Sequence, residues 1–206
     1  KSNWEDAYDA IVKKIVNTNP KKISGFIGDM TNMETIYAAK DLFEKTIKSK
    51  NLEFRDDKYY LNLSKRDNYL LNSSIEGIER SDLIILIGAN PRFEATILNA
   101  RIRKNYLKNR TEVISLGDLD DLTYPYKIVN NATEIIKDII TDKNDISDKI
   151  KKAKYPSIIF GESALKLSSA VYIFEELKKY LDKNNKITEE WNPINVLSKN
   201  SSTVGA

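Results

Sequence analysis

A run of five consecutive aliphatic residues, Leu83–Ile87, constrains the fold of this chain more than any other feature. The run contains no polar residue, which is typical of a strand covered on both faces, as in a parallel sheet between two layers of helices. Gly88 and Pro91 then turn the chain at the carboxyl end of this strand, where open α/β sheets place their binding crevice. The run therefore predicts an α/β fold: a doubly wound, mainly parallel sheet with helices on both faces.

The rest of the chain supplies alternating strands and helices for such a sheet. We expect further strands at 23–27, 51–54, 112–116 and 157–160, and helices at 4–16, 32–48, 94–108, 132–140 and 168–181. The segment 55–74, rich in Tyr, Asn and Asp, is expected to be an ordered but irregular loop. The polar segment 141–149 is the predicted boundary between an α/β domain at 1–142 and the incomplete start of a second α/β unit at 143–206.

Cysteine and histidine are both absent from the 206 residues. Their absence excludes disulfides, thiolate chemistry, iron–sulfur ligation and the common zinc sites, and it removes the usual general base, so we predict no catalytic residue and no metal site. The 33 basic and 30 acidic residues nearly balance, at a net charge of +3, and acids interrupt the basic segments. Solvated helix faces are therefore favoured over a nucleic-acid-binding patch. No apolar stretch approaches about 18 residues, so membrane contact is expected only through a partner.

Three of the predicted strands end in small polar loops, with the sequences FIGDM, LIGANP and IFGES. In one doubly wound sheet these loops would line the same edge, and their backbone N–H groups could hold phosphates. The candidate crevice residues are Gly28, Asp29, Gly88, Asn90 and Gly161. A single glycine in each loop is a weak signal, because a dinucleotide fingerprint needs several glycines at fixed spacing.

Basic residues surround the helix that follows the LIGANP loop. Arg101 and Arg103 lie on different faces of this helix, and Arg92 precedes it. Arginine is well suited to a bidentate grip on carboxylates, so these three arginines are candidate interface residues. We further expect Arg101 or Arg103 to fix the helix to neighbouring loops, with Glu94 and Asp82 as candidate partners.

The run LIGANPRFEATILNARIRK at 86–104, with DLTYPY at 121–126 and WNPINVL at 191–197, closely resembles the large iron–sulfur subunit (the 75 kDa type) of respiratory complex I. The resemblance is to the carboxyl-terminal half of that subunit, a relative of molybdopterin oxidoreductases, and weaker similarity covers essentially the whole chain. In the family the run typically reads NPR, one variable residue, EAP, two aliphatics and NARIRK, whereas Thr96 stands here in place of the proline. The chain begins without Met, and we expect it to be a piece of a longer protein.

The resemblance implies a subunit of NADH:ubiquinone oxidoreductase, the proton-translocating NADH dehydrogenase. It implies a non-catalytic scaffold in the peripheral arm, which supports electron transfer from NADH to ubiquinone carried out by neighbouring segments. Iron–sulfur clusters are expected in the companion amino-terminal part of the subunit, which would be the main partner together with other peripheral-arm subunits. The expected location is the matrix side of the mitochondrial inner membrane or, alternatively, the cytoplasmic face of a bacterial inner membrane.

The same resemblance bears on the strand-end crevice. In catalytic molybdopterin relatives, equivalent loops bind the pterin-guanine dinucleotide, and the complex I branch is understood to have lost that cofactor. We therefore expect a vestigial crevice and no cofactor in this chain, because a fold often outlives its function.

Two other classes of function remain open from the residues. A free-standing α/β nucleotide- or pterin-binding oxidoreductase domain would use the strand-end crevice, and tight binding of a nucleotide or pterin would favour it. A basic nucleic-acid-binding protein would show a steep salt dependence of RNA or DNA binding. Neither class accounts for the similarity along the whole chain.

Overall fold

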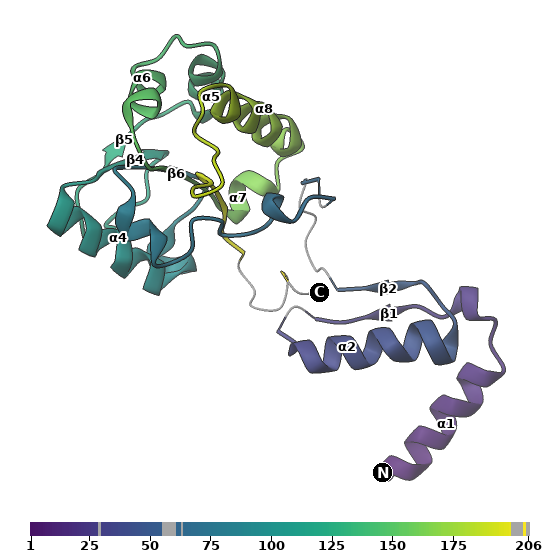
Figure 1. Cartoon of the computed structure of the whole chain (residues 1–206). Helices are drawn as coiled ribbons and strands as arrows, with labels where there is room; N and C mark the ends of the chain where they lie inside the picture. Colours follow the sequence, from purple (N-terminus) through teal and green to yellow (C-terminus); the bar gives the residue numbers. More distant parts are fainter. Residues whose placement is uncertain (29, 55–60, 63, 199–203, 205–206) are drawn as a thin grey trace. The chain divides into compact units, whose positions relative to one another are not determined.

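The computed structural model describes residues 1–28, 30–54, 61–62, 64–198 and 204. The chain forms two compact units, one built from residues 1–57 and 200–206 and the other from residues 58–199 (Figure 1).

The first unit is a small helix-and-strand unit. Its elements are α1 (Trp4–Val16), η1 (Pro20–Lys22), β1 (Gly25–Phe26), α2 (Met33–Asp41), η2 (Leu42–Ile47) and β2 (Leu52–Glu53). Strands β1 and β2 pair in parallel with each other and form a separate two-stranded sheet, along which α2 lies (Figure 1). The expectation that the strands at 23–27 and 51–54 join the main sheet is therefore wrong. These strands lack the long buried aliphatic run of a central strand, and Phe26 is exposed.

The second unit contains a five-stranded, fully parallel sheet in the order β5-β4-β3-β6-β7. Its elements are η3 (Arg66–Asn68), η4 (Gly77–Arg80), β3 (Leu83–Ile87), α3 (Pro91–Glu94), α4 (Thr96–Asn109), β4 (Glu112–Leu116), β5 (Lys127–Ile128), α5 (Ala132–Ile140), α6 (Asp145–Lys152), β6 (Pro156–Phe160), α7 (Glu162–Leu165), α8 (Ala170–Lys183) and β7 (Ile194–Val196). The central strand β3 pairs with β4 on one side and β6 on the other, and all five of its residues are buried. The predicted parallel α/β sheet is confirmed.

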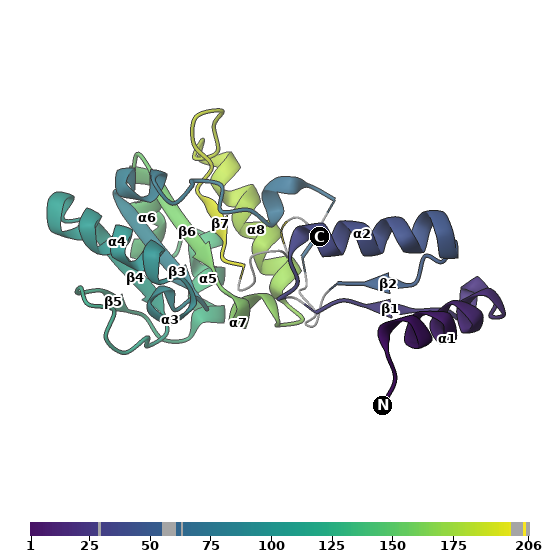
Figure 2. The same ribbon diagram turned by 90° about the horizontal axis from the view of Figure 1, so that it is seen from below.

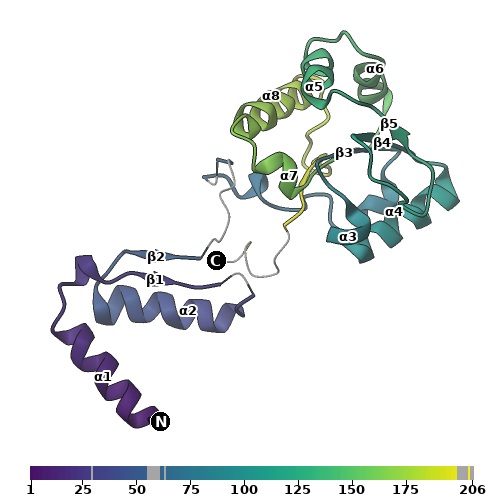
Figure 3. The ribbon, with the colours of Figure 1, turned by 180° about the vertical axis from the view of Figure 1, so that it is seen from behind.

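Alternate residues of β3 belong to two different cores. Leu83, Ile85 and Ile87 pack in a core with α5, α6 and α8, whereas Ile84 and Leu86 pack in a second core with η4 and α4. Figures 1 and 3 show the same layers, with α4 on one face of the sheet and α5, α6 and α8 on the other. The aliphatic run of β3 is thus uninterrupted because both faces of the strand are buried, as expected.

The predicted boundary between residues 142 and 143 lies inside this second unit. Strands β6 and β7, which follow that position, extend the sheet that holds β3 and β4. The polar segment 141–149 is the junction of α5 and α6, where the Asn144 side chain accepts a hydrogen bond from the Ile146 N–H at 2.9 Å and caps α6. Its polarity therefore reflects a helix cap and a solvated helix surface.

The helix predicted at 94–108 is interrupted near its amino end, whereas the one predicted at 168–181 is found close to its expected position. The helix expected at 94–108 is divided into the single turn α3 and the long α4, because Ala95 adopts φ −153° and ψ 73°, which is not helical. The helix expected at 168–181 is α8, and the short α7 precedes it.

The segment 64–74 of the expected irregular loop carries only the short η3. The Ser73 N–H and hydroxyl both donate to Asn195 Oδ1 in β7, at 2.9 and 2.8 Å.

Buried amide side chains connect α4 to the loops beside the sheet. Asn105 Nδ2 donates to the carbonyl oxygens of Ile78 at 2.9 Å and of Ser81 at 2.7 Å. Nearer the start of the helix, Asn99 Nδ2 donates to the Leu122 carbonyl at 3.1 Å. Because these groups are removed from water, the bonds set the position of α4 along the sheet as well as stabilise it.

We predict that Asn105→Ala lowers the free energy of unfolding by about 1–3 kcal/mol, because the buried carbonyls of Ile78 and Ser81 each lose one of their two hydrogen-bond donors. Urea unfolding followed by circular dichroism measures the loss. Lys108→Ala is the matched control on the same helix, since Lys108 is exposed and its removal is expected to stay within about 0.5 kcal/mol. Equal stabilities of the two variants would contradict the role of Asn105.

Candidate functional site

The structure brings together three of the five predicted crevice residues. Strands β3 and β6 are parallel neighbours, so the loops that hold Gly88, Asn90 and Gly161 lie at the same end of the sheet, where α3 and α7 begin (Figure 2). Gly28 belongs to the first unit, whose two-stranded sheet is separate, and Asp29 lies outside the described residues. Of the three loops that were expected to line one edge of the sheet, two are found there.

These two loops contact each other backbone to backbone. A Cβ atom at Gly161 would lie 2.1 Å from the Gly88 carbonyl oxygen and 2.4 Å from Ala89 Cα. Gly88 has a φ of +59°, and a Cβ there would lie 2.6 Å from the Ala164 nitrogen. The Ser163 hydroxyl donates to the Gly88 carbonyl at 2.8 Å. The glycines thus permit a close contact between the two loops.

Both polar side-chain atoms of Asn90 form hydrogen bonds with backbone groups. Its Oδ1 accepts from the Arg92 N–H at 3.2 Å and caps α3, and its Nδ2 donates to the Leu119 carbonyl at 3.3 Å. The Arg92 guanidinium in turn pairs with Asp121, at 2.6 Å between Nη1 and Oδ2. The pKa of the Asp121 carboxyl is lowered, first by the Thr123 N–H and then by Arg92. Asn90 and Arg92 therefore link α3 to the 119–123 loop.

A small, mostly apolar hollow lies at the carboxyl ends of the strands. It is a hollow of about 200 Å³ lined by Ile87, Gly88, Leu116, Ala132, Thr133, Ile136, Phe160, Ser163, Ala164, Leu167, Ala170 and Ile173. The lining contains no cation, and one of its two hydroxyls, that of Ser163, is already bonded to Gly88. Ligand pockets commonly have volumes of about 300–1,000 Å³ and a few convergent polar groups. This hollow is smaller and less polar than that.

The basic residues of α4 contact a carboxylate that the sequence pattern did not single out. Glu79 of η4 pairs with the Arg101 guanidinium and also with Lys104, at 2.7 Å between Oε2 and Nζ. Hydrogen bonds from Lys104 and then Arg101 hold the pKa of the Glu79 carboxyl below its usual range. Arg103 Nε donates to the Thr123 carbonyl at 3.3 Å. Both arginines thus fix α4 to neighbouring loops, as expected.

Asp82, one of the two partners expected for these arginines, bonds to other groups. Asp82 accepts from the backbone N–H groups of Lys154 and Tyr155, at 2.6 and 2.9 Å, and so connects the start of β3 to the segment before β6. Glu79 lies 22 residues before Arg101 in a short 3₁₀ turn, and no periodic pattern relates the two. Only the tertiary structure brings them together.

A second, larger hollow of about 560 Å³ lies at η4, on the side where the strands begin. Its charged lining residues balance: the acids are Glu76, Glu79 and Glu190, and the bases are Arg80, Lys104 and Lys108. The Arg80 guanidinium lies over the rings of Tyr155 and Trp191, at 4.7 and 5.7 Å from their centroids. The charged side chains that line this hollow thus sum to no net charge.

Neither a membrane-spanning helix nor a metal-binding cluster of carboxylates occurs in the described part of the chain. None of the helices there combines the length and hydrophobicity that crossing a bilayer requires. The Asp and Glu side chains described do not come together in groups of three that could hold a metal ion.

Comparisons with known proteins match this chain along its entire length. It is 32% identical over 204 residues to the NADH-quinone oxidoreductase G subunit of Rickettsia bellii, and the match covers 99% of this chain and 30% of the relative. It is 34% identical over 213 residues to the mitochondrial NADH-ubiquinone oxidoreductase 78 kDa subunit of Neurospora crassa, and that match covers 100% of this chain and 28% of the relative. The chain thus spans less than a third of the length of these relatives. The sequence profile of the Molybdopterin oxidoreductase family matches residues 1–206, and the chain belongs to that family.

Proposed function

We propose that this chain is a non-catalytic scaffold within the large iron–sulfur subunit of respiratory complex I. The observation that supports it best is the contact of Gly161 with the Gly88 loop, because it occupies the strand-end position where a binding crevice of this fold would open. The names of the relatives, a subunit of an NADH-quinone oxidoreductase and a mitochondrial 78 kDa subunit, support the assignment to the complex.

In this proposal the chain braces the electron-carrying part of the peripheral arm. Iron–sulfur clusters would be held by the companion amino-terminal part of the subunit, since this chain has no Cys and no His. The subunit would lie on the matrix side of the mitochondrial inner membrane or on the cytoplasmic face of a bacterial one. Membrane attachment would come through other subunits of the complex.

The packing of the second unit suits a bracing role. Its sheet is buried on both faces, and close-packed interiors of this kind resist deformation and transmit strain. Ion pairs and buried amides hold α4 to the loops on both sides of it, through Glu79 and Leu122 among others. Such a body keeps its surface groups in fixed positions, which is the requirement for orienting neighbouring proteins.

Native-gel fractionation of gently solubilised source membranes, with mass spectrometry of the bands, tests this function. We predict that peptides of this chain co-migrate with NADH dehydrogenase activity at high mass, because a scaffold is retained in the assembled complex. Migration of the chain outside any NADH-oxidising assembly would contradict the proposal.

The alternative, a nucleotide- or pterin-binding oxidoreductase domain, makes the opposite prediction for ligands. We predict no saturable binding of GTP or of molybdopterin guanine dinucleotide to the chain up to about 1 mM by calorimetric titration. The apolar lining of the 200 Å³ hollow is the reason. Saturable binding with a micromolar dissociation constant would instead support the alternative.

The loop contact at Gly161 yields a prediction about stability. Gly161→Ala is expected to cost about 3 kcal/mol or more, because the new methyl group would meet the backbone of Gly88 and Ala89. Gly28→Ala is the matched control, since no atom lies within 4 Å of the position that its Cβ would take. Chemical unfolding of both variants measures the difference. A Gly161→Ala variant as stable as the control would show that the two loops are separated in solution.

A further inference from the structure

The outer face of α3 and α4, on the side away from the sheet, carries three large apolar side chains in solvent. Phe93 is 75% exposed, Ile97 66% and Leu107 56%. Ile97, Ala100 and Leu107 follow the spacing of one helix face. We refer to Phe93, Ile97, Ala100, Arg103, Leu107 and Lys108 as the α4 outer face. Exposed apolar side chains gathered on one surface are a common mark of an interaction site.

A shallow groove runs over the second half of this face. It has a volume of about 450 Å³ and is lined by Ala100, Arg103, Lys104, Leu107 and Lys108. The small side chain of Ala100 leaves room between Ile97 and Leu107, so a second helix can approach the backbone of α4 closely here. The groove therefore suits an inserted apolar side chain, with basic groups beside it.

The charges on the face are only partly neutralised by the chain itself. Lys104 is paired with Glu79. Arg103, in contrast, has the Thr123 carbonyl as its partner, and Lys108 has no carboxylate within ion-pair distance in the part of the chain that the structure describes. Two cations beside Leu107 are therefore available to an external carboxylate.

We infer that the α4 outer face docks an acidic amphipathic segment of a neighbouring subunit. Apolar side chains of that segment would pack on Ile97 and Leu107, and its carboxylates would pair with Arg103 and Lys108. The inference rests on the proposed function for the existence of the neighbour, and it adds the surface and the partner's chemistry. An anionic membrane is the weaker fit, because Glu79 already pairs with two of the basic residues of α4, Arg101 and Lys104, whereas lipid-binding segments typically gather about 4–8 basic residues.

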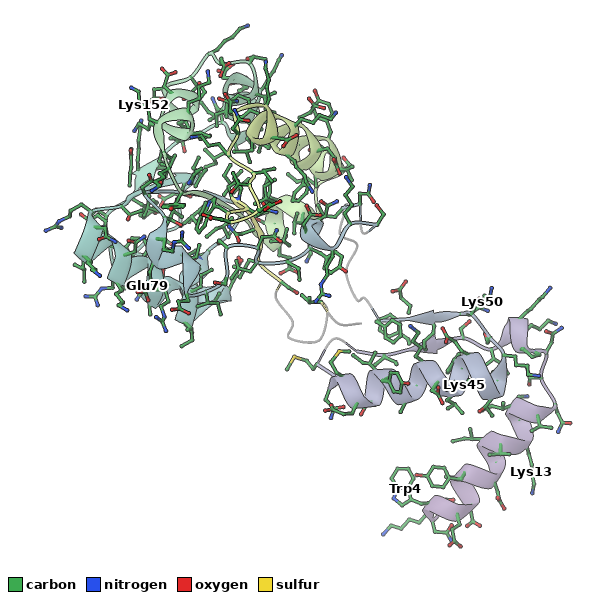
Figure 4. All side chains as sticks on the ribbon, viewed as in Figure 1. Trp4, Lys13, Lys45, Lys50, Glu79 and Lys152 are labelled. Atoms are coloured by element: carbon green, nitrogen blue, oxygen red, sulfur yellow. The ribbon has the colours of Figure 1, made fainter. Side chains whose placement is uncertain are left out.

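Charge reversal on the assembled subunit tests the inference. The double variant Arg103→Glu/Lys108→Glu is expected to lower incorporation of the subunit into the complex about tenfold, measured as its share of the NADH-oxidising band on native gels. Lys152→Glu on the opposite face of the sheet is the control for charge reversal, since Lys152 is exposed in the last turn of α6 (Figure 4). Lys108 is likewise exposed in the last turn of α4. Circular dichroism of the isolated chains establishes that each variant folds.

Failure of the inference can be distinguished from failure of the proposed function. If the unaltered chain is absent from the NADH-oxidising band, the scaffold function fails and the docking inference with it. If the unaltered chain is present and the double variant enters the band as well as Lys152→Glu does, the scaffold function stands and the docking inference is overturned.

Photo-cross-linking identifies the partner without altering the charges. A benzophenone amino acid at Ile97 in the purified complex is expected to cross-link to a segment of another subunit rich in Asp and Glu. The same amino acid at Tyr172 of α8, which is 69% exposed on the other side of the sheet, is the control and should not reach that segment. Cross-links from position 97 to lipid, to a segment without acids, or to no neighbour would overturn the inference.

Discussion

Burial of β3 on both faces is the constraint on which the rest of the second unit depends. Its five aliphatic side chains alternate between two cores, so neither face of the sheet can remain in water without losing about 25 cal/mol for each Å² of apolar surface exposed. One face requires α4 and η4, and the other requires α5, α6 and α8. The parallel pairing with β4 and β6 follows as well, because helical crossovers are what bring the chain back to the same edge of the sheet.

The strand-end loops show how two glycines can serve packing at the carboxyl edge of a parallel sheet. Gly88 and Gly161 occur where a parallel sheet commonly presents backbone N–H groups to a ligand. Here the two glycines permit one loop to pack on the other, and Ser163 adds a hydrogen bond across the contact. A glycine at such a position reports close approach of backbone atoms, and the approaching group can equally be protein or ligand.

The parts of this structure that could be predicted from the sequence are those with a local pattern. The aliphatic composition of Leu83–Ile87 was enough to indicate that this strand is buried. The helices α4, α5 and α8 were expected close to their observed positions. Pairings between distant residues carry no such signal: Glu79 reaches Arg101 from a four-residue turn, and Asp82 accepts from Lys154 and Tyr155, more than 70 residues away. The sequence also predicted strands at the positions of β1 and β2. A strand of two residues is too short to show a pattern that would indicate which sheet it joins.

The bonds on the buried face of α4 fix the position of the side chains on its exposed face. Inside, Asn99 and Asn105 bond to carbonyls on either side of the helix, and these buried bonds tolerate little sliding because each displaced group would lose its partner in a dry environment. A helix held in this way presents Ile97, Leu107 and Arg103 at fixed spacing, and a partner loses less conformational entropy on binding a surface that is already ordered. Polar side chains in the interior thus contribute to recognition at the surface, although none of them touches the partner.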